Sequence, residues 1–396
     1  MLQRKAVCFL LLLLAQPVWA EWSGYTALEY RHFPHEPLYA QQHEDNTSVA
    51  LQPEYYYQWD DGRQLFSFIP FIRADEHDDE RSHADIRELA WIKAADSWEL
   101  RLGIRKVFWG VTESQHLVDI INQTDLVENT DGEDKLGQPM LNLALIGDYG
   151  TVDLFVLPYF RERTFPGQEG RLRSEPYVDT DQDAIYQSAD KEKHIDYAAR
   201  WSKTLGAWDI GLSHFYGTSR DPRFTVGTNA SGGTVLIPNY DLIHQTGLDV
   251  QATIGSWLWK LEAIRRSSDT ETYNASTTGL EYTFYGIGQS ATDLGLVVEY
   301  LFDSRAKPDA SPFDDDVMLG LRFTLNDVQS TEALLGMIKD RDYDTTLYSI
   351  EASRRLGDAW KLSLEARYFE DVDERDSSFN AIRNDDFVQL ELAFYF

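Results

Sequence analysis

The sequence predicts an all-β protein, a transmembrane antiparallel up-and-down β-barrel of about 18 strands, with 16 strands as the alternative count. Three observations support this fold class. Apolar and polar residues alternate along many segments of strand length, as they do when the two faces of a strand meet different surroundings. Long and short connections follow each other in turn. Aromatic residues make up 13% of the chain, and Trp and Tyr gather at both membrane interfaces of such barrels.

The first residues have the features of an export signal. Two basic residues precede an apolar run at 6–15, and small residues around Ala20 fit a signal-peptidase site. The apolar run is well short of the ~20 residues with which a helix crosses a bilayer. We therefore expect residues 1–20 to be a signal peptide and residues 21–396 to form a single barrel domain.

Composition excludes several classes of protein. The single cysteine, Cys8, lies inside the expected signal peptide, so the exported chain would have no disulfide, zinc-thiolate site or cysteine nucleophile. A net charge of -30 argues against a nucleic-acid partner, which would need a basic surface. The mean hydropathy of -0.42 argues against a helical membrane protein. We expect neither a cofactor nor a metal.

The strands are predicted from the period-two pattern, in chain order. The expected ranges are 23–32, 47–59, 64–74, 84–94, 98–108, 139–147, 151–163, 193–204, 208–217, 241–254, 257–267, 275–284, 293–303, 316–325, 329–339, 344–355, 360–370 and 386–396.

The last of these segments has the clearest pattern. One of its faces carries only apolar residues, and the other carries Gln389 and Glu391 among its members; the apolar set is Val388, Leu390, Leu392, Phe394 and Phe396. Such a strand suits lipid on one side and water on the other. A terminal strand ending in Phe also resembles the assembly signal of Gram-negative outer-membrane barrels, which implies outer-membrane lipid and the assembly machinery as partners.

The connections predict which end of the barrel faces which compartment. Short links such as 60–63 and 95–97 alternate with longer ones, and acidic runs at 75–80, 179–183 and 314–316 fall in the longer set. We expect short periplasmic turns, long acidic extracellular loops and a periplasmic N-terminus. The shortest outer connection is expected near 340–343.

Tryptophans stand directly after tight turns, at Trp98, Trp208, Trp257 and Trp360. An aromatic girdle at the periplasmic interface predicts this placement. The alternative is a secreted all-β protein, such as a sandwich, a propeller or a lipocalin-like barrel, which would hide its apolar face from water by packing a second layer on it.

Charged residues of both signs occupy the opposite parity, which would face the lumen. The inward set includes Glu99, Arg101, Arg105, Lys260, Glu262, Arg322 and Arg367. A wall of mixed charge favours passage of polar solutes such as sugars and carboxylates. The alternative is that these residues form salt bridges which only stiffen and fill the barrel.

The connection at 110–138 is much longer than a hairpin needs. Barrels of 16 to 18 strands enclose an aqueous channel unless something folds into it. Because this loop is partly apolar, it either enters the lumen and constricts it or packs outside as a lid on other loops.

The stretch at 102–110, running into 117–125, resembles a pattern of porin-like outer-membrane proteins, in which a strand ending in Arg and Trp-Gly precedes an Asp-Ile/Val-x-Asn-x-x-Asp segment. It is more distantly similar to alginate-export and substrate-specific porins. The resemblance implies a channel in the outer membrane, reached through the periplasm, for sugars, organic acids or oligosaccharides. It also implies residues at or beside a constriction, namely Arg105, Trp109, Asp119, Asn122 and Asp125.

Two other functions remain open at this stage. One is a plugged barrel with a structural or adhesive role. The other is an outer-membrane hydrolase, which the sequence favours less, because none of the nine histidines forms a recognisable signature with a nucleophile. We therefore expect no enzymatic activity.

Overall fold

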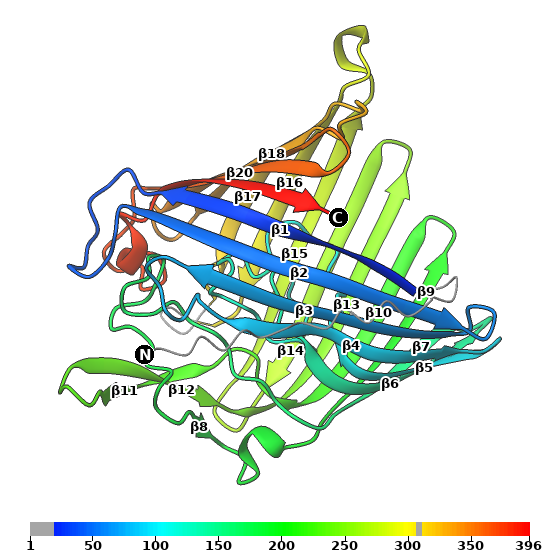
Figure 1. Cartoon of the computed structure of the whole chain (residues 1–396), viewed down its shortest axis with the longest axis horizontal. Coiled ribbons are helices and arrows are strands. Elements are labelled where there is room, and N and C mark those ends of the chain that lie inside the picture. The colour runs from blue at the N-terminus through cyan, green and yellow to red at the C-terminus, as the bar shows by residue number, and fades with distance from the viewer. Residues whose placement is uncertain (1–19, 306–310) are drawn as a thin grey trace, which may run out of the picture.

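The computed structural model describes residues 20–305 and 311–396, so the predicted signal peptide, apart from Ala20, lies outside the described residues. Eighteen strands form one closed antiparallel sheet that curls into a barrel (Figure 1). Each barrel strand pairs with the next one along the chain. The barrel closes where β21 (Phe387–Tyr395) pairs with β1 (Ala20–His32), in a register that sets Leu28 opposite Leu392.

The other barrel strands are β2 (Asp45–Trp59), β3 (Gln64–Asp75), β4 (Ala84–Ala94), β5 (Trp98–Arg105), β6 (Gln138–Gly147), β7 (Gly150–Leu157), β9 (Asp196–Leu205), β10 (Trp208–Thr218), β13 (Leu242–Ile254), β14 (Trp257–Ser267), β15 (Thr272–Phe284), β16 (Asp293–Asp303), β17 (Asp315–Thr324), β18 (Glu332–Asp340), β19 (Thr346–Leu356) and β20 (Trp360–Glu370). A separate small sheet contains β8 (Ile185–Tyr186), β11 (Arg223–Thr228) and β12 (Thr234–Tyr240). Short 3-10 helices lie at Lys191–Lys193, Ile287–Gln289 and Asn380–Ile382.

The predicted fold class and the count of 18 strands are confirmed, and the alternative count of 16 is wrong. Two strands end three or more residues earlier than expected. β5 stops at Arg105 rather than 108, because the side chain of Asn122 takes the backbone N–H of Val107. β7 stops at Leu157 rather than 163, because Phe160 leaves the sheet to pack on Tyr240, with ring centroids 4.8 Å apart.

The connections differ in length between the two ends of the barrel. Glycines make tight turns at one end: Gly206 has φ 64° and Gly255 has φ 63°, values that side chains with a Cβ rarely adopt. The shortest connection at the other end is 268–271, so the expectation of 340–343 was wrong. The pattern missed β11 and β12, whose hairpin lies in the 219–241 connection and contacts β8.

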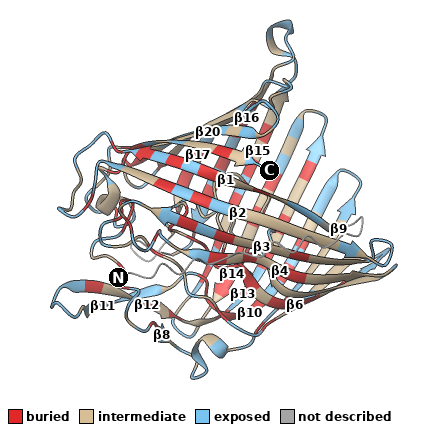
Figure 2. Cartoon of the chain, viewed as in Figure 1, coloured by how far each residue is buried: buried red, intermediate tan, exposed pale blue. Residues whose placement is uncertain are grey.

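The outer face of the barrel is apolar and the inner face is polar. Exposed and buried positions alternate along the strands (Figure 2), with Val388 and Leu390 of β21 each 46% exposed. Trp208, Trp257 and Trp360 are exposed at the starts of strands that follow short turns, which fits an interfacial girdle. Among the residues described, no helix has the length and apolarity to span a membrane.

The largest apolar cluster lies inside the barrel. Val118, Ile120 and Ile121, from the connection between β5 and β6, pack against inward-facing side chains of β7, β10, β13 and β14, including Phe155 and Phe215. The long connection therefore has an apolar surface that the inner wall covers.

Candidate channel lumen

The connection between β5 and β6, residues 106–137, is called the inner segment here. Its two ends are held together by Asn122, which is 4% exposed. The Asn122 Oδ1 accepts the N–H of Val107 at 2.8 Å, and its Nδ2 donates to the backbone oxygens of Arg105 and Leu136, each at 2.8 Å. One amide side chain thus satisfies backbone groups at both ends of the segment.

Two buried glutamates of the barrel wall bind residues 111–118 of the inner segment. The carboxylate of Glu262, on β14, accepts the N–H groups of Val111 at 2.6 Å, Thr112 at 3.0 Å and Val118 at 3.1 Å. Its side chain is fully buried. Because a buried carboxylate is costly without compensating hydrogen bonds, this set of donors makes Glu262 a specific anchor for the segment.

Glu299, on β16, is the second anchor. Its carboxylate accepts the N–H of Glu113 at 2.8 Å and both the N–H and the hydroxyl of Ser114, at 2.9 and 2.6 Å. The residue is 0% exposed. Residues 111–114 of the inner segment are therefore fixed to the part of the barrel wall that contains β14 and β16.

His116 adds a cation to this contact. Its Nε2 lies 2.5 Å from Glu133 Oε1, and its Nδ1 lies 3.8 Å from Glu262 Oε1. Burial lowers the pKa of His116, but the hydrogen bonds and negative charges of Glu133 and Glu262 outweigh it and raise the pKa to about 10. The imidazolium therefore partly neutralises the anchoring carboxylates at neutral pH.

The inner segment also contacts the wall formed by β17 to β21, through side chains rather than backbone. Glu113 Oε2 lies 2.6 Å from Arg322 Nη2, and Asn129 Nδ2 donates to Glu365 at 3.1 Å. Arg367 is shared among three carboxylates, those of Glu351 at 2.7 Å, Glu365 at 3.1 Å and Asp131 at 3.5 Å. This cluster carries more negative than positive charge.

Asp131 belongs to the inner segment and is one of the three carboxylates around Arg367. Burial, followed by repulsion from Glu365, raises its pKa to about 7, against the lowering effect of Arg367. Its charge therefore changes near neutral pH.

A polar cavity of about 420 Å³ lies between the inner segment and the β17 to β21 wall. Six carboxylates and two cations line it; the carboxylates are Glu113, Asp131, Glu332, Glu351, Glu365 and Glu391, and the cations are Arg322 and Lys361. An acidic, water-accessible space of this kind attracts cations and excludes anions at low ionic strength.

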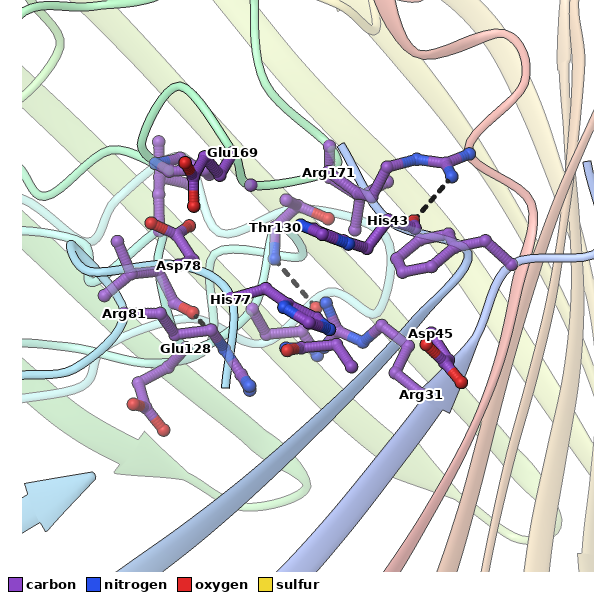
Figure 3. A pocket seen from close by; sticks show the side chains of 18 residues that line it. Arg31, His43, Asp45, His77, Asp78, Arg81, Glu128, Thr130, Glu169 and Arg171 are labelled. Atoms are coloured by element: carbon purple, nitrogen blue, oxygen red, sulfur yellow. Dashed lines mark hydrogen bonds between the residues drawn. The ribbon is translucent and has the colours of Figure 1, made fainter. Parts of the chain in front are cut away.

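A second, smaller crevice of about 40 Å³ lies on the other side of residues 128–130, among the long connections (Figure 3). The imidazoles of His43 and His77 stack there with centroids 3.7 Å apart, and Arg171 donates to the backbone oxygen of His43 at 3.0 Å. Asn129 lines both this crevice and the larger cavity. The side chain of Asn129 therefore stands between the two spaces.

The predicted site residues fall into three groups. Arg322 and Arg367 lie on the wall that the inner segment contacts, as described above. Glu99 and Arg101 form a separate pair on β5, where Arg101 also donates to Asn142 at 2.7 Å and lies 3.2 Å from Asp153. The remaining five belong to the inner segment or its base: Arg105, Trp109, Asp119, Asn122 and Asp125.

The members of this third group are mostly buried and act on each other. Asp119 Oδ1 accepts the N–H of Trp109 at 2.6 Å, and burial raises the pKa of Asp119 to about 6. The Trp109 ring packs on Phe155, and the Nε of Arg105 has no hydrogen-bond partner within 20–305 and 311–396. None of the five is among the residues that line the larger cavity. These residues therefore stabilise the fold of the inner segment and do not face the space that a solute could occupy.

Asp125 is fully buried at the base of the segment. Its Oδ2 lies 2.7 Å from Arg87 Nη1 and 3.3 Å from His83 Nε2, and its Oδ1 accepts the Thr164 hydroxyl at 2.7 Å. Burial opposes ionisation, but His83 and Arg87 outweigh it and lower the pKa of Asp125 to about 2. The carboxylate is therefore ionised throughout the physiological range.

His83, Asp125 and Glu128 bring possible metal-ligand atoms within 4.8 Å of one another. Arginines already occupy this space: Arg87 contacts Asp125, and Arg73 binds both oxygens of Glu128, at 2.8 and 2.7 Å. A divalent cation would have to displace these guanidinium groups. The cluster is better described as a buried ion-pair network.

Several residues of the lumen were not found from the sequence. The pattern places Glu262 on the inward face but gives no sign of its anchoring role, and it does not single out Glu299, Asn129 or Asp131. Each acts on a residue far away in the chain, such as Glu299 on Ser114, 185 positions apart. The sequence shows only that these strand residues alternate onto the inward face of the barrel. It does not show which residue of the inner segment each one contacts.

No protein-family model matches the chain, and no curated protein gives a significant match. Solved structures do match. A BenF-like porin from Pseudomonas fluorescens Pf-5 superposes with a TM-score of 0.56 at 11% identity, covering 96% of this chain and 97% of that one. This chain has the fold of a porin barrel. OpdO of Pseudomonas aeruginosa gives a TM-score of 0.54 at 10% identity, with 96% of each chain covered. At such identities the likeness extends to the fold alone.

Proposed function

We propose that the protein is an outer-membrane porin, a non-enzymatic channel through which small polar solutes diffuse. The observation that carries this proposal is the polar cavity of about 420 Å³ beside the inner segment, inside a closed barrel. A barrel of 18 strands is wide enough for an aqueous channel, and the mixed charge of its wall suits hydrated solutes such as sugars and organic acids.

The outer face supports placement in a membrane. Its exposed residues are apolar over most strands, and tryptophans follow the short turns, as at Trp257 and Trp360. We further propose that residues 1–20 direct export through the periplasm, and that the outer-membrane assembly machinery recognises β21. The short turns would then face the periplasm and the long connections the outside.

The inner segment, which contains all but the last residue of the predicted loop at 110–138, serves as the constriction in this proposal. Glu262 and Glu299 hold it against one wall, so solutes pass on the opposite side, through the polar cavity that the inner segment shares with the β17 to β21 wall. Asn129 separates the outer crevice from the larger cavity, because it lines both. The buried residues Trp109, Asp119, Asn122 and Asp125 set the shape of the segment.

The acidic lining gives a preference for cations at low salt. Six carboxylates face two cations in the cavity. Because the screening length is about 10 Å at 0.1 M ionic strength, this preference weakens as salt increases. Neutral sugars would pass according to size.

One observation favours a plugged barrel with a structural role: the outer crevice measures only about 40 Å³, and the apolar part of the inner segment fills much of the β7 to β14 side. Liposome swelling separates the two functions. Proteoliposomes of the folded barrel should swell in small neutral sugars and swell less as sugar size increases. Absence of swelling in the smallest sugars, with the barrel folded and inserted, would favour the plugged barrel and exclude the porin.

A further inference from the structure

One part of the barrel's outer face carries polar residues on four neighbouring strands. It lies at the ends of β10, β13, β14 and β15 near the long connections. The register of these strands places their outward residues in two adjacent rows; one row is Tyr216, His244, Ser267 and Thr272, and the other is His214, Thr246, Arg265 and Asn274. These eight residues are called the outer polar patch.

The members of the patch contact one another. His214 Nδ1 lies 2.9 Å from the Thr246 hydroxyl, and the imidazole of His244 stacks on Tyr216 with centroids 4.6 Å apart. Arg265 donates to Asn274 Oδ1 at 3.3 Å. Arg265 forms no ion pair with any residue that the structure describes, although the chain as a whole is strongly acidic.

Comparable positions on other strands carry aromatic residues. Arg265 stands eight positions after Trp257, which belongs to the girdle, whereas Tyr30 stands eight after Trp22 and Tyr368 eight after Trp360. Eight residues of a tilted strand rise about 20 Å along the barrel axis, close to the edge of an apolar band about 25 Å tall. Tyr216 keeps an aromatic residue at this position of β10, eight after Trp208, whereas β13, β14 and β15 carry polar residues at the level where lipid headgroups lie.

We propose that the outer polar patch binds the phosphate group of an outer-leaflet glycolipid. The guanidinium of Arg265 offers paired N–H donors that match phosphate oxygens, and His214, His244 and Asn274 supply further donors around it. The charge complementarity is local: Arg265 is a permanent cation at headgroup level on the wall of an acidic protein, and it has no carboxylate partner among the described residues.

The surroundings leave the patch accessible from the headgroup layer. The turn above it, 268–271, is the shortest connection at this end of the barrel. The two carboxylates of that turn contact other groups: Asp269 accepts from Gln187 Nε2 at 2.7 Å, and Glu271 lies 3.8 Å from Arg305. The side chain of Arg265 instead donates to Asn274.

The test measures binding of a bisphosphorylated lipid A glycolipid to the full-length folded barrel in detergent by native mass spectrometry, with the dephosphorylated glycolipid as the comparison probe. Arg265→Gln should weaken binding of the phosphorylated form about tenfold, as the loss of one charge-assisted contact predicts, and should not change binding of the dephosphorylated form. Arg265→Lys should restore part of the affinity.

Arg354→Gln is the matched control, because Arg354 is an outward-facing cation on β19 at the end of the barrel with the short turns, away from the patch. It should bind the phosphorylated lipid like the wild type. Equal losses in the two variants, or no loss in Arg265→Gln, would overturn the proposal. A change from one oligomeric state to another in Arg265→Gln, with lipid binding intact, would assign the patch to a second copy of the chain instead. Heat-modifiable migration confirms that each variant is folded, and conductance measured in parallel keeps this outcome separate from the channel proposal.

Discussion

The two walls that the inner segment contacts use the same type of side chain in different ways. On β14 and β16, Glu262 and Glu299 are fully buried and accept backbone N–H groups of the segment. On β19 and β20, Glu351 and Glu365 share Arg367 and line a cavity. A glutamate whose acceptor sites are filled by backbone donors fixes the segment, whereas one that shares a cation beside open space sets the charge of a passage.

Removing an anchor should have the largest effect. Glu262→Ala leaves the N–H groups of Val111, Thr112 and Val118 buried without an acceptor, which should cost about 3 kcal/mol and release the segment from the β14 wall. We expect a lower unfolding temperature and a larger, noisier single-channel conductance. Glu374→Ala, at an exposed position in the 371–386 connection, should change neither. Wild-type stability and conductance in Glu262→Ala would contradict the anchoring role.

Removing the shared cation on the other wall should change selectivity instead of stability. Arg367→Met leaves Asp131, Glu351 and Glu365 without their guanidinium partner, so the passage becomes more negative. We expect the cation-to-anion permeability ratio from reversal potentials to rise about twofold at low salt and to return toward wild type at ~1 M salt. Arg354→Met, on the outer face, serves as the control. An unchanged ratio at low salt would place ion flow elsewhere.

The pH dependence of selectivity should be smaller. The pKa of Asp131 is raised to about 7 by burial and by Glu365, so Asp131 is mostly neutral at pH 6 and mostly ionised at pH 8. Cation selectivity should therefore increase over this interval, and Asp131→Asn should remove the increase.

The same pKa shift affects stability. Because the pKa of Asp131 in the folded state lies above the ordinary value of 3.8, the stability that neutral Asp131 provides is complete below about pH 4 and is lost as pH rises through 7. A wild-type increase that persists in Asp131→Asn would assign the titration to another group, with Glu351, Glu365 and Asp134 as the nearby carboxylates.

The smallest effect is expected at Asn129. Asn129→Ala removes the side chain that separates the outer crevice from the larger cavity and its hydrogen bond to Glu365. Single-channel conductance should rise, by less than in Glu262→Ala, with little change in unfolding temperature. Asn326→Ala, in a short turn, should leave conductance unchanged. A fall in conductance would mean that Asn129 holds the passage open rather than narrowing it.

The sequence predicted the barrel well, because strand and turn signals are local. The alternation that identifies 257–267 as a strand agrees with β14 at both ends, and the turn glycines mark the short connections. The prediction failed where the chain stops obeying the period: β7 ends at Leu157 because Phe160 packs on a residue 80 positions away.

The lumen was less predictable, since its contacts join distant parts of the chain. The sequence left two positions open for residues 110–138, inside the barrel or on top of it, and hydrogen bonds from Thr112 to Glu262 and from Ser114 to Glu299 decide the path of the segment. The outer polar patch could not be predicted for the same reason: His214 and Arg265 lie on different strands, and only the strand register shows that they belong to one row. The roles of Arg105, Asp119 and Asp125 in conduction stay predictions.

The central claim is that the inner segment narrows the barrel without closing it. Single-channel recording of the folded wild-type protein in planar bilayers tests this most directly. We predict discrete conductance steps with a weak preference for cations at low salt. A protein that folds and inserts, as judged by heat-modifiable migration and protease protection, yet produces no steps in any bilayer would contradict the claim.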